Sequence, residues 1–334
     1  MAAGHVSPGR GRRSFSSRLA IAKQFLAAAG AVLAGRNPAR RVRSALRRLA
    51  GAPSAPSAAR REAPALRCLR GAPLDVAGPI CLFVAYAPDG RLFDHTVRYC
   101  ADLRRGGLGL VLVVITDRPD LECRDPGQEA ADTVLVRENQ GYDFAAWADA
   151  LRFMPEIWQA PELWFANDSV YHSPRLLASM IARVRASRAD IVAATASTEV
   201  APHFQSYFFA LKATPDRRLP ARNFWDGVSV LEDKLQVIRD YEVRQKSVLE
   251  AGGLTLEVLY PLPPDPRNHL QERWRALLDA GFPFVKIELL RDNPHRVDLG
   301  GWRDLLDAHG FDTAQVAFHL GARASGAAAL MEVR

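Results

Sequence analysis

Short apolar runs alternate with segments of helical periodicity between residues 80 and 195. Five runs have the length and composition of buried strands, namely residues 80–86, 108–116, 133–137, 162–166 and 190–195. Three intervening segments have apolar residues at helical spacing, at 93–105, 144–153 and 176–186. Strands alternating with helices predict right-handed crossover units. We therefore expect an α/β fold with a mostly parallel sheet flanked by helices.

The pattern is less regular after residue 195. Strands are expected over residues 204–211 and 284–290, and helices over 231–252, 274–280 and 298–309. The chain has no internal repeat. The length of 334 residues allows one large domain or two small ones.

Composition divides the chain into four expected parts. Residues 1–50 are rich in Arg and predict a partly helical or disordered N-terminal segment. Residues 51–78 are rich in Ala, Pro and Ser, which is typical of a linker. Residues 79–312 contain the predicted strands and helices and are the expected folded domain. Residues 313–334 are Ala-rich and are expected to form a C-terminal tail.

The formal net charge of +7 is unevenly distributed. Residues 1–72 contain 15 basic residues and one acid, Glu62, whereas the remainder contains 29 basic and 36 acidic residues. A mildly acidic body argues against an extended nucleic-acid surface, which needs clustered Lys and Arg. The basic segment has apolar residues at helical spacing near residues 42–49. Such a helix can lie on an anionic membrane surface, and a solvated basic tail is the alternative.

The four cysteines and the hydropathy both favour a cytoplasmic location. No C-x-x-C pair or zinc-site spacing is present, and the cysteines do not form a disulfide framework. No apolar run approaches the roughly 20 residues that a membrane span needs. We expect a cytoplasmic protein that contacts the inner face of the membrane through residues 1–50.

A polar loop follows the third predicted strand. In open α/β sheets, ligands bind at the carboxyl ends of the strands. Asn139, Gly141, Tyr142 and Asp143 precede a predicted helix, whose free N–H groups favour anions. Gly141 permits a tight turn, and Tyr142 can stack on a base or sugar or pack in the core. Asp143 is a candidate ligand contact, and the alternative is a helix N-cap.

A second polar loop, Asn167-Asp168-Ser169, follows the fourth predicted strand. Mg and Mn prefer oxygen ligands and usually bind through one or two carboxylates together with phosphate oxygens. Asp168 is therefore a candidate metal ligand, with Asn167 beside it. A polar turn or helix cap before Pro174 is the alternative.

A third polar segment follows the fifth predicted strand. His203, Gln205 and Tyr207 alternate with Phe204, Ser206 and Phe208, which predicts a strand with one polar face. Histidines in isolation are more often structural than functional, but this polar face is expected beside the two loops described above.

These segments, in this order, resemble the rhamnan synthesis protein F family over residues 80 to 310. The matching blocks are residues 137–147, 167–170, 203–208, 241–243, 283–286 and 289–294. The resemblance implies a GT-A-like glycosyltransferase of Rossmann-like architecture. Such an enzyme uses a nucleotide-activated sugar in the assembly of rhamnose-containing cell-surface polysaccharide.

The resemblance also implies partners and site residues. It implies dTDP-rhamnose or another nucleotide sugar as donor, and a glycan or lipid-linked glycan as acceptor. Donor contacts would come from Asn139, Gly141, Tyr142, Asp143, Asn167 and Gln205. A GT-A-like enzyme has a D-x-D signature after strand four, but this chain has Asn167-Asp168-Ser169. A Mg or Mn ion at Asp168 is therefore implied by position, while half of the usual carboxylate pair is missing.

Sugar transfer has two chemical needs. The leaving diphosphate must be neutralised, by a metal or by cationic and N–H donors. An inverting reaction also needs a base, for which Glu199, His203 and Glu242 are the candidates. Glu242 can equally form an ion pair with Lys246 on a helix surface. The alternative function is a non-catalytic polysaccharide assembly or glycan-binding protein with a degenerate transferase fold, which the incomplete acidic signature motivates.

Overall fold

The computed structural model describes residues 64–72, 74–118, 120, 123–263 and 269–322, all within the compact unit Arg61–Arg334. The predictions for residues 1–50, including the membrane-binding helix, lie outside the described residues. The first part of the predicted linker, residues 51–63, lies outside them as well.

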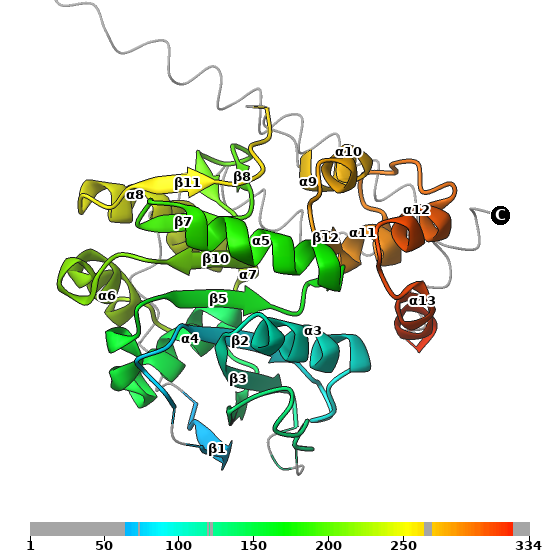
Figure 1. Cartoon of the computed structure of the whole chain (residues 1–334). Coiled ribbons are helices and arrows are strands. Elements are labelled where there is room, and N and C mark those ends of the chain that lie inside the picture. Colours follow the sequence, from blue (N-terminus) through cyan, green and yellow to red (C-terminus); the bar gives the residue numbers. More distant parts are fainter. Residues whose placement is uncertain (1–63, 73, 119, 121–122, 264–268, 323–334) are drawn as a thin grey trace, which may run out of the picture. The chain divides into compact units, whose positions relative to one another are not determined.

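An eight-stranded sheet forms the centre of this unit (Figure 1). In spatial order its strands are β1 (Arg67–Arg70), β4 (Thr133–Glu138), β3 (Gly109–Thr116), β2 (Ile80–Tyr86), β5 (Leu163–Asn167), β10 (Phe208–Leu211), β7 (Ile191–Ala193) and β11 (Leu256–Val258). Strands β4, β3, β2 and β5 are parallel, and β11 is parallel to β7. Strand β10 runs antiparallel to both of its neighbours, and β1 runs antiparallel to β4. The predicted α/β fold with a mostly parallel sheet flanked by helices is confirmed.

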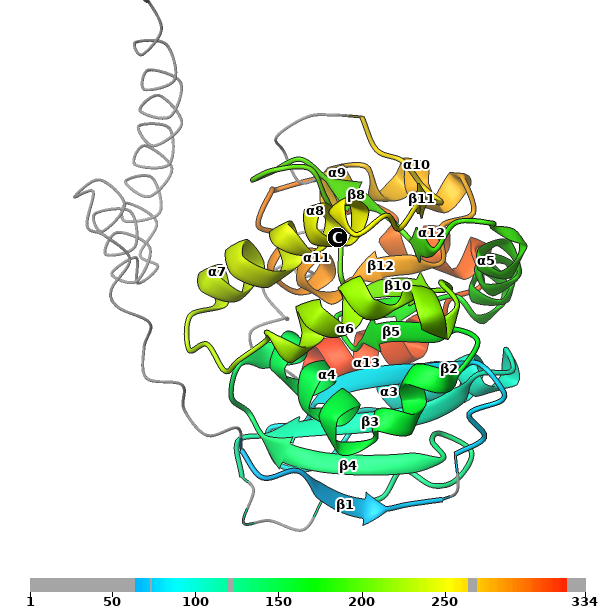
Figure 2. The same cartoon turned by 90° about the vertical axis from the view of Figure 1, so that its left-hand side faces the viewer.

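Helices cover both faces of the sheet, which explains why its inner strands are almost entirely apolar. Helices α3 (Asp94–Arg105) and α5 (Pro174–Ala186) pack on one face, against alternate strand residues such as Phe83. Helices α4 (Tyr142–Phe153), α6 (Leu219–Asp226) and α8 (Val243–Ala251) pack on the other face, against residues such as Leu82. Figure 2 shows α5 on one side of the sheet and α4 and α6 on the other.

A third apolar cluster lies at the carboxyl side of the sheet. It is built on a two-stranded antiparallel ribbon of β6 (Val170–His172) and β12 (Phe284–Lys286). The surrounding helices are α10 (Trp274–Asp279), α11 (Ile287–Asp292), α12 (Trp302–Ala308) and α13 (Thr313–Ala322). Helix α9 (His269–Glu272) instead packs Leu270 with the cluster on the α3 and α5 face of the sheet. The predicted strand over residues 284–290 is wrong after Lys286, because α11 begins at Ile287 and buries Leu289 and Leu290 as a helix.

The predicted helix and strand after residue 195 are both interrupted. The helix over 231–252 consists of α7 (Lys234–Val237), a π-helical segment (Ile238–Glu242) and α8. The strand over 204–211 is divided into β9 (His203–Phe204) and β10, and β9 pairs with β8 (Ala196–Ser197). Two 3₁₀ turns, Pro155–Gln159 and Pro215–Arg217, complete the described elements.

The folded unit extends beyond the predicted limits of 79 and 312. Strand β1 lies within the predicted linker, residues 51–78, and forms the edge of the sheet. Apolar periodicity did not predict it because an edge strand needs few buried residues. It is held instead by the Arg70 guanidinium, which binds the Asp125 carboxylate and the Ala131 carbonyl. Helix α13 lies within the predicted tail and contacts α3 and α12.

Two further sequence-based expectations concern membrane-spanning helices and the cysteines. Among the described residues, no helix combines the length and the apolar composition that crossing a membrane requires. Cys81, Cys100 and Cys123 are buried free thiols, whereas Cys68 is exposed.

A buried ion pair joins β4 to α4. Arg137 Nη2 lies 3.1 Å from Asp149 Oδ2, and both side chains are almost completely buried. Burial lowers the pKa of Arg137 and raises the pKa of Asp149, although each charge partly offsets the effect on the other. The pair fixes α4 on the sheet, and α4 begins directly after the polar loop that follows β4.

The variant Asp149→Asn should lower the free energy of unfolding by about 3–5 kcal/mol, because it leaves the Arg137 charge buried and uncompensated. Urea unfolding measures this change. The control is Asp240→Asn in the exposed Arg239–Asp240 pair, which should change the free energy by less than about 1 kcal/mol. Equal midpoints for the two variants would contradict the role assigned to Arg137 and Asp149.

Candidate functional site

The topological switch point of the sheet lies between β2 and β5. Strands β3 and β4 follow β2 on one side, whereas β5 lies on its other side. In open α/β sheets, ligands bind outside the carboxyl ends of the strands at such a point. Strand β2 ends at Tyr86 and β5 ends at Asn167, so these two residues mark the candidate site.

Hydrogen bonds connect the carboxyl ends of β2, β3, β4 and β5. Asp168 Oδ2 accepts from the Tyr86 backbone N–H at 2.9 Å, and the Asp168 N–H donates to the Val84 carbonyl at 3.2 Å. The Tyr86 hydroxyl donates to Asp117, which follows β3. Asn139 Nδ2, which follows β4, donates to the same carboxylate at 2.8 Å. The predicted residues Asn139 and Asp168 are thus linked through Tyr86 and Asp117.

Asn167 joins the two polar loops that the sequence singled out. Its Nδ2 donates to Asp143 Oδ2 at 2.8 Å, and its Oδ1 accepts from the Ser169 N–H at 3.2 Å and the Ser169 hydroxyl at 2.6 Å. The alternative interpretation of Asp143 as a helix N-cap is wrong, since Gly141 is the N-cap of α4 and no side chain caps the helix. Burial raises the pKa of Asp143, while the hydrogen bond from Asn167 acts in the opposite direction.

Two successive residues in the left-handed region lead the chain into α4. Gly141 has φ 76° and Tyr142 has φ 58°. A Cβ atom at residue 141 would lie 2.6 Å from the Ala145 Cβ and 3.1 Å from the Val230 Cα, so only glycine fits. A tyrosine at positive φ is uncommon, and such backbone strain is concentrated at functional sites. This turn places Asp143 where it accepts the hydrogen bond from Asn167.

The variant Gly141→Ala should lower the free energy of unfolding by about 2–4 kcal/mol, because it adds overpacking to left-handed strain. The control is Gly253→Ala, at φ 82° with no atom within 4 Å of the added Cβ. That variant has the strain alone and should cost about 1–2 kcal/mol. Chemical denaturation of both variants measures the difference, and a smaller cost at Gly141 than at Gly253 would contradict this account.

Lys286 is a site residue to which the sequence assigned no role. It belongs to the matching block at 283–286, but only the pairing of β12 with β6 brings it to the β5 loop. Its Nζ donates to Ser169 Oγ at 3.1 Å and lies 4.0 Å from the centre of the Tyr207 ring. Burial lowers the pKa of Lys286 to about 8, against the opposing charges of Glu242, Glu288 and Asp143.

Glu242 is one of the acidic residues whose charge acts on Lys286. It is the last residue of the π-helical segment, and such segments are frequent at functional sites. Its Oε1 accepts from the Ser206 N–H at 3.0 Å and from the Ser206 hydroxyl at 2.9 Å. Its charge affects the pKa of both Asp143 and Lys286. The alternative pair with Lys246 is not formed, because Lys246 pairs with Glu250 at 2.6 Å.

The other two candidate bases have different surroundings. Glu199 is exposed in the connection between β8 and β9, where its N–H donates to Ser197 Oγ. His203 is buried, and its Nδ1 bonds the Ala201 carbonyl at 2.8 Å. In the part of the chain that the structure describes, neither side chain hydrogen-bonds to Glu242 or to the loop residues of the site.

Gln205 is connected to the site through a short network. Its Oε1 accepts from the Thr195 hydroxyl at 2.8 Å, and that hydroxyl lies 2.7 Å from the Tyr207 hydroxyl. The ring of Tyr207 in turn lies against Lys286. Gln205 therefore supports the residues around the lysine. The expected strand with one polar face is not formed, because residues 205–207 lie between β9 and β10.

The β5 loop offers a Mg or Mn ion a single carboxylate, that of Asp168. One oxygen of Asp168 accepts from Tyr86, and both polar atoms of the Asn167 amide have partners within the protein. Over residues 64–322, apart from the few left undescribed, no group of three or more His, Cys, Asp or Glu side chains is arranged to hold a metal.

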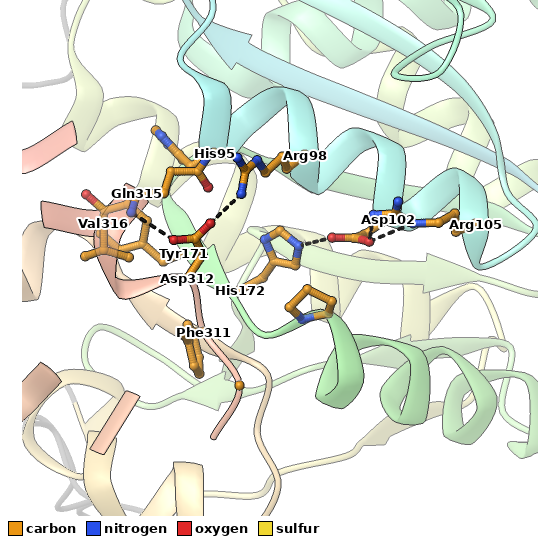
Figure 3. A pocket seen from close by; sticks show the side chains of 12 residues that line it. His95, Arg98, Asp102, Arg105, Tyr171, His172, Phe311, Asp312, Gln315 and Val316 are labelled. Atoms are coloured by element: carbon orange, nitrogen blue, oxygen red, sulfur yellow. Dashed lines mark hydrogen bonds and ion pairs between the residues drawn. The ribbon is translucent and has the colours of Figure 1, made fainter. Parts of the chain in front are cut away.

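A cavity of about 370 Å³ lies elsewhere, between α3, the end of β6 and the start of α13 (Figure 3). Its charged side chains pair with one another. His172 Nε2 lies 2.7 Å from Asp102 Oδ2, Asp102 also binds Arg105, and Asp312 binds Arg98. Burial raises the pKa of Asp102, but hydrogen bonds from His172 and Arg105 bring it below its ordinary value. None of the predicted site residues lines this cavity.

Comparisons with known proteins give a family and two relatives. The model of the family described as rhamnan synthesis protein F matches residues 121–297, more than half of the chain. Virulence protein VirA of Vibrio anguillarum is 26% identical over 253 residues, which cover 64% of this chain and 80% of VirA. The uncharacterized protein y4gN of Sinorhizobium fredii is 30% identical over 193 residues, which cover 55% of this chain and 49% of y4gN.

Among solved structures, the inositol-1-phosphate CTP transferase from T. maritima is similar with a TM-score of 0.32 and 14% identity. The match covers 55% of this chain and 86% of that one.

Proposed function

Because the chain belongs to the rhamnan synthesis protein F family, we propose that it transfers a sugar from a nucleotide-sugar donor to a growing cell-surface polysaccharide. Family membership itself supports a part in polysaccharide synthesis. The single observation that supports sugar transfer best is the cluster at the switch point. There Asn167 bonds Asp143, Lys286 bonds Ser169, and Glu242 lies close enough to affect the pKa of both charged partners.

The donor would bind at the carboxyl ends of β2, β4 and β5, in a GT-A-like arrangement. Free N–H groups in the first turn of α4 favour anions, which suits a diphosphate. The polar residues Asn139 and Asp117, which are already hydrogen-bonded to each other, would contact the nucleoside. Gly141, Tyr142, Asp143 and Asn167 would shape the donor site. dTDP-rhamnose is the first donor to test, and a glycan or lipid-linked glycan is the proposed acceptor.

Glu242 is our candidate base for an inverting transfer. Its carboxylate would accept the proton of the acceptor hydroxyl while that oxygen attacks the anomeric carbon and the bond to the nucleoside diphosphate breaks. The electrostatic coupling of Glu242 to Asp143 and Lys286 supports this choice. Glu199 is exposed to solvent, and His203 Nδ1 is already hydrogen-bonded to the Ala201 carbonyl. Both are therefore weaker candidates than Glu242.

We propose that the reaction takes place in the cytoplasm. Residues 1–50, with their excess of Arg, would hold the protein at the inner face of the membrane, where a lipid-linked acceptor is within reach.

A non-catalytic assembly or glycan-binding protein is the second candidate function. It is favoured by the loop after β5, where the carboxylate of Asp168 and the amide of Asn167 are engaged within the protein. Such a protein would bind glycans without a nucleotide-sugar donor.

A screen of nucleotide sugars by thermal shift separates the two functions. We expect at least one nucleotide sugar to stabilise the fold, by about 2.7 kcal/mol at a concentration 100 times its Kd, because it binds only the folded state. Oligosaccharides of the polysaccharide serve as the comparison. If glycans stabilise the protein while no nucleotide sugar does so, with or without Mn, the transferase proposal fails.

The variant Glu242→Gln should reduce turnover by about 10²–10⁴-fold, because the amide cannot accept the proton. The donor should still bind, since the amide oxygen can still accept from Ser206. Radiolabelled sugar transfer measures turnover, and calorimetry measures donor binding. Glu250→Gln, on the exposed ion pair with Lys246, is the matched control and should retain full activity. Full activity of Glu242→Gln would remove Glu242 from the mechanism.

A further inference from the structure

A sugar nucleotide places concentrated negative charge at the site. The departing diphosphate must be neutralised by a metal ion or by cationic and N–H donors aimed at it. The loop after β5 has a single carboxylate, and one of its oxygens is held by the Tyr86 N–H. A cationic side chain at this place would neutralise the diphosphate directly.

The backbone places Lys286 at the β5 loop independently of its side-chain conformation. In the ribbon, Lys286 lies opposite Val170, the first residue of β6. The next residue, Ile287, donates its N–H to the Ser169 carbonyl at 3.1 Å. Two consecutive residues of the C-terminal region are thus fixed against the loop that carries Asp168.

The ammonium group is held in position but retains hydrogen-bonding capacity. An ammonium has three N–H donors. Within the described part of the chain, its hydrogen bond goes to Ser169 Oγ, and the Tyr207 ring packs against it at 4.0 Å. Tyr207 is itself fixed by Thr195, so the ring cannot easily move away.

Among the described residues, no carboxylate forms an ion pair with Lys286, although several act on it at longer range. Burial lowers its pKa to about 8, and the charges of Glu242, Glu288 and Asp143 counteract this effect at longer range. Removing an ammonium from water costs free energy that a direct ion pair or a bound anion can recover. A positioned, partly desolvated cation in a ligand-binding region is a typical functional group.

We propose that the Lys286 ammonium binds the diphosphate of the donor, in the place where a divalent cation would otherwise act. This inference rests on the proposed function, and it adds that donor binding does not require Mg or Mn. Lys286 is then a donor-binding residue that also stabilises the charge developing on the leaving diphosphate. Lys234, whose charge acts on both Asp143 and Lys286, adds positive potential to the same region.

The test measures the binding of dTDP and UDP to the full chain by calorimetry, in EDTA and in Mn. For the wild type, we expect the tighter of the two nucleotides to bind with a Kd that changes by less than about threefold between the two conditions. Lys286→Met should weaken binding in EDTA by about 10–100-fold, the usual effect of losing a charged hydrogen bond. Lys286→Arg keeps the charge and should retain binding within about tenfold of the wild type.

Lys246→Met is the matched control, because Lys246 lies on α8 and pairs with Glu250. It should bind like the wild type. Urea unfolding of each variant establishes that it is folded, and Lys286→Arg keeps the test decisive if Lys286→Met unfolds.

The outcomes separate this inference from the function on which it rests. Binding that is lost in EDTA and restored by Mn overturns the role of Lys286 but leaves sugar transfer in place. Unchanged binding by folded Lys286→Met overturns it as well. Failure of all nucleotides to bind the wild type, in EDTA and in Mn, overturns both the inference and the proposed function.

Discussion

The hydrogen bond from Asn167 to Asp143 is the contact on which the candidate site depends. It joins the end of β5 to the first turn of α4, which follows a different strand, β4. Neither partner can move alone, because the Asn167 amide oxygen accepts from Ser169 and α4 is held to β4 by the Arg137–Asp149 pair. The same contact explains why Asp143 is not a helix cap, since its carboxylate points to a neighbouring strand and leaves the helix N–H groups available.

The sheet and its helices could be predicted from the sequence as far as β7, because each element there has its own periodicity. Strand β2 was predicted to the residue, and α3, α4 and α5 to within two residues. The edge strand β1 was missed because polar contacts of Arg70 hold it. After residue 195 the prediction was poorer, since the short strand β12 and the π-helical segment depend on contacts with distant residues.

The site residues differ in the same way. Some can be found from the local sequence pattern, and others depend on contacts with distant parts of the chain. Loops after buried strands can be found from sequence alone, and the structure places Asn139, Asp143, Asn167 and Asp168 at one edge of the sheet. Choosing among Glu199, His203 and Glu242 was not possible from sequence, because the choice depends on which element folds beside the loops. Lys286 was not recognised as a site residue for the same reason, since its partner Ser169 lies 117 positions earlier in the chain.

The pairing of β12 with β6 has a consequence for the order in which the protein can mature. Ribosomes deliver the N-terminal part of a chain first, and domains begin to fold during synthesis. Strands β2 to β5 can assemble into their parallel sheet early, whereas the ribbon has to wait for residues 284–286, more than 100 positions later. The nascent chain therefore has a largely complete sheet but lacks the lysine beside Ser169. Interrupted translation before β12 would leave the site without that charge, so the site is completed only after residues 284–286 have been synthesised.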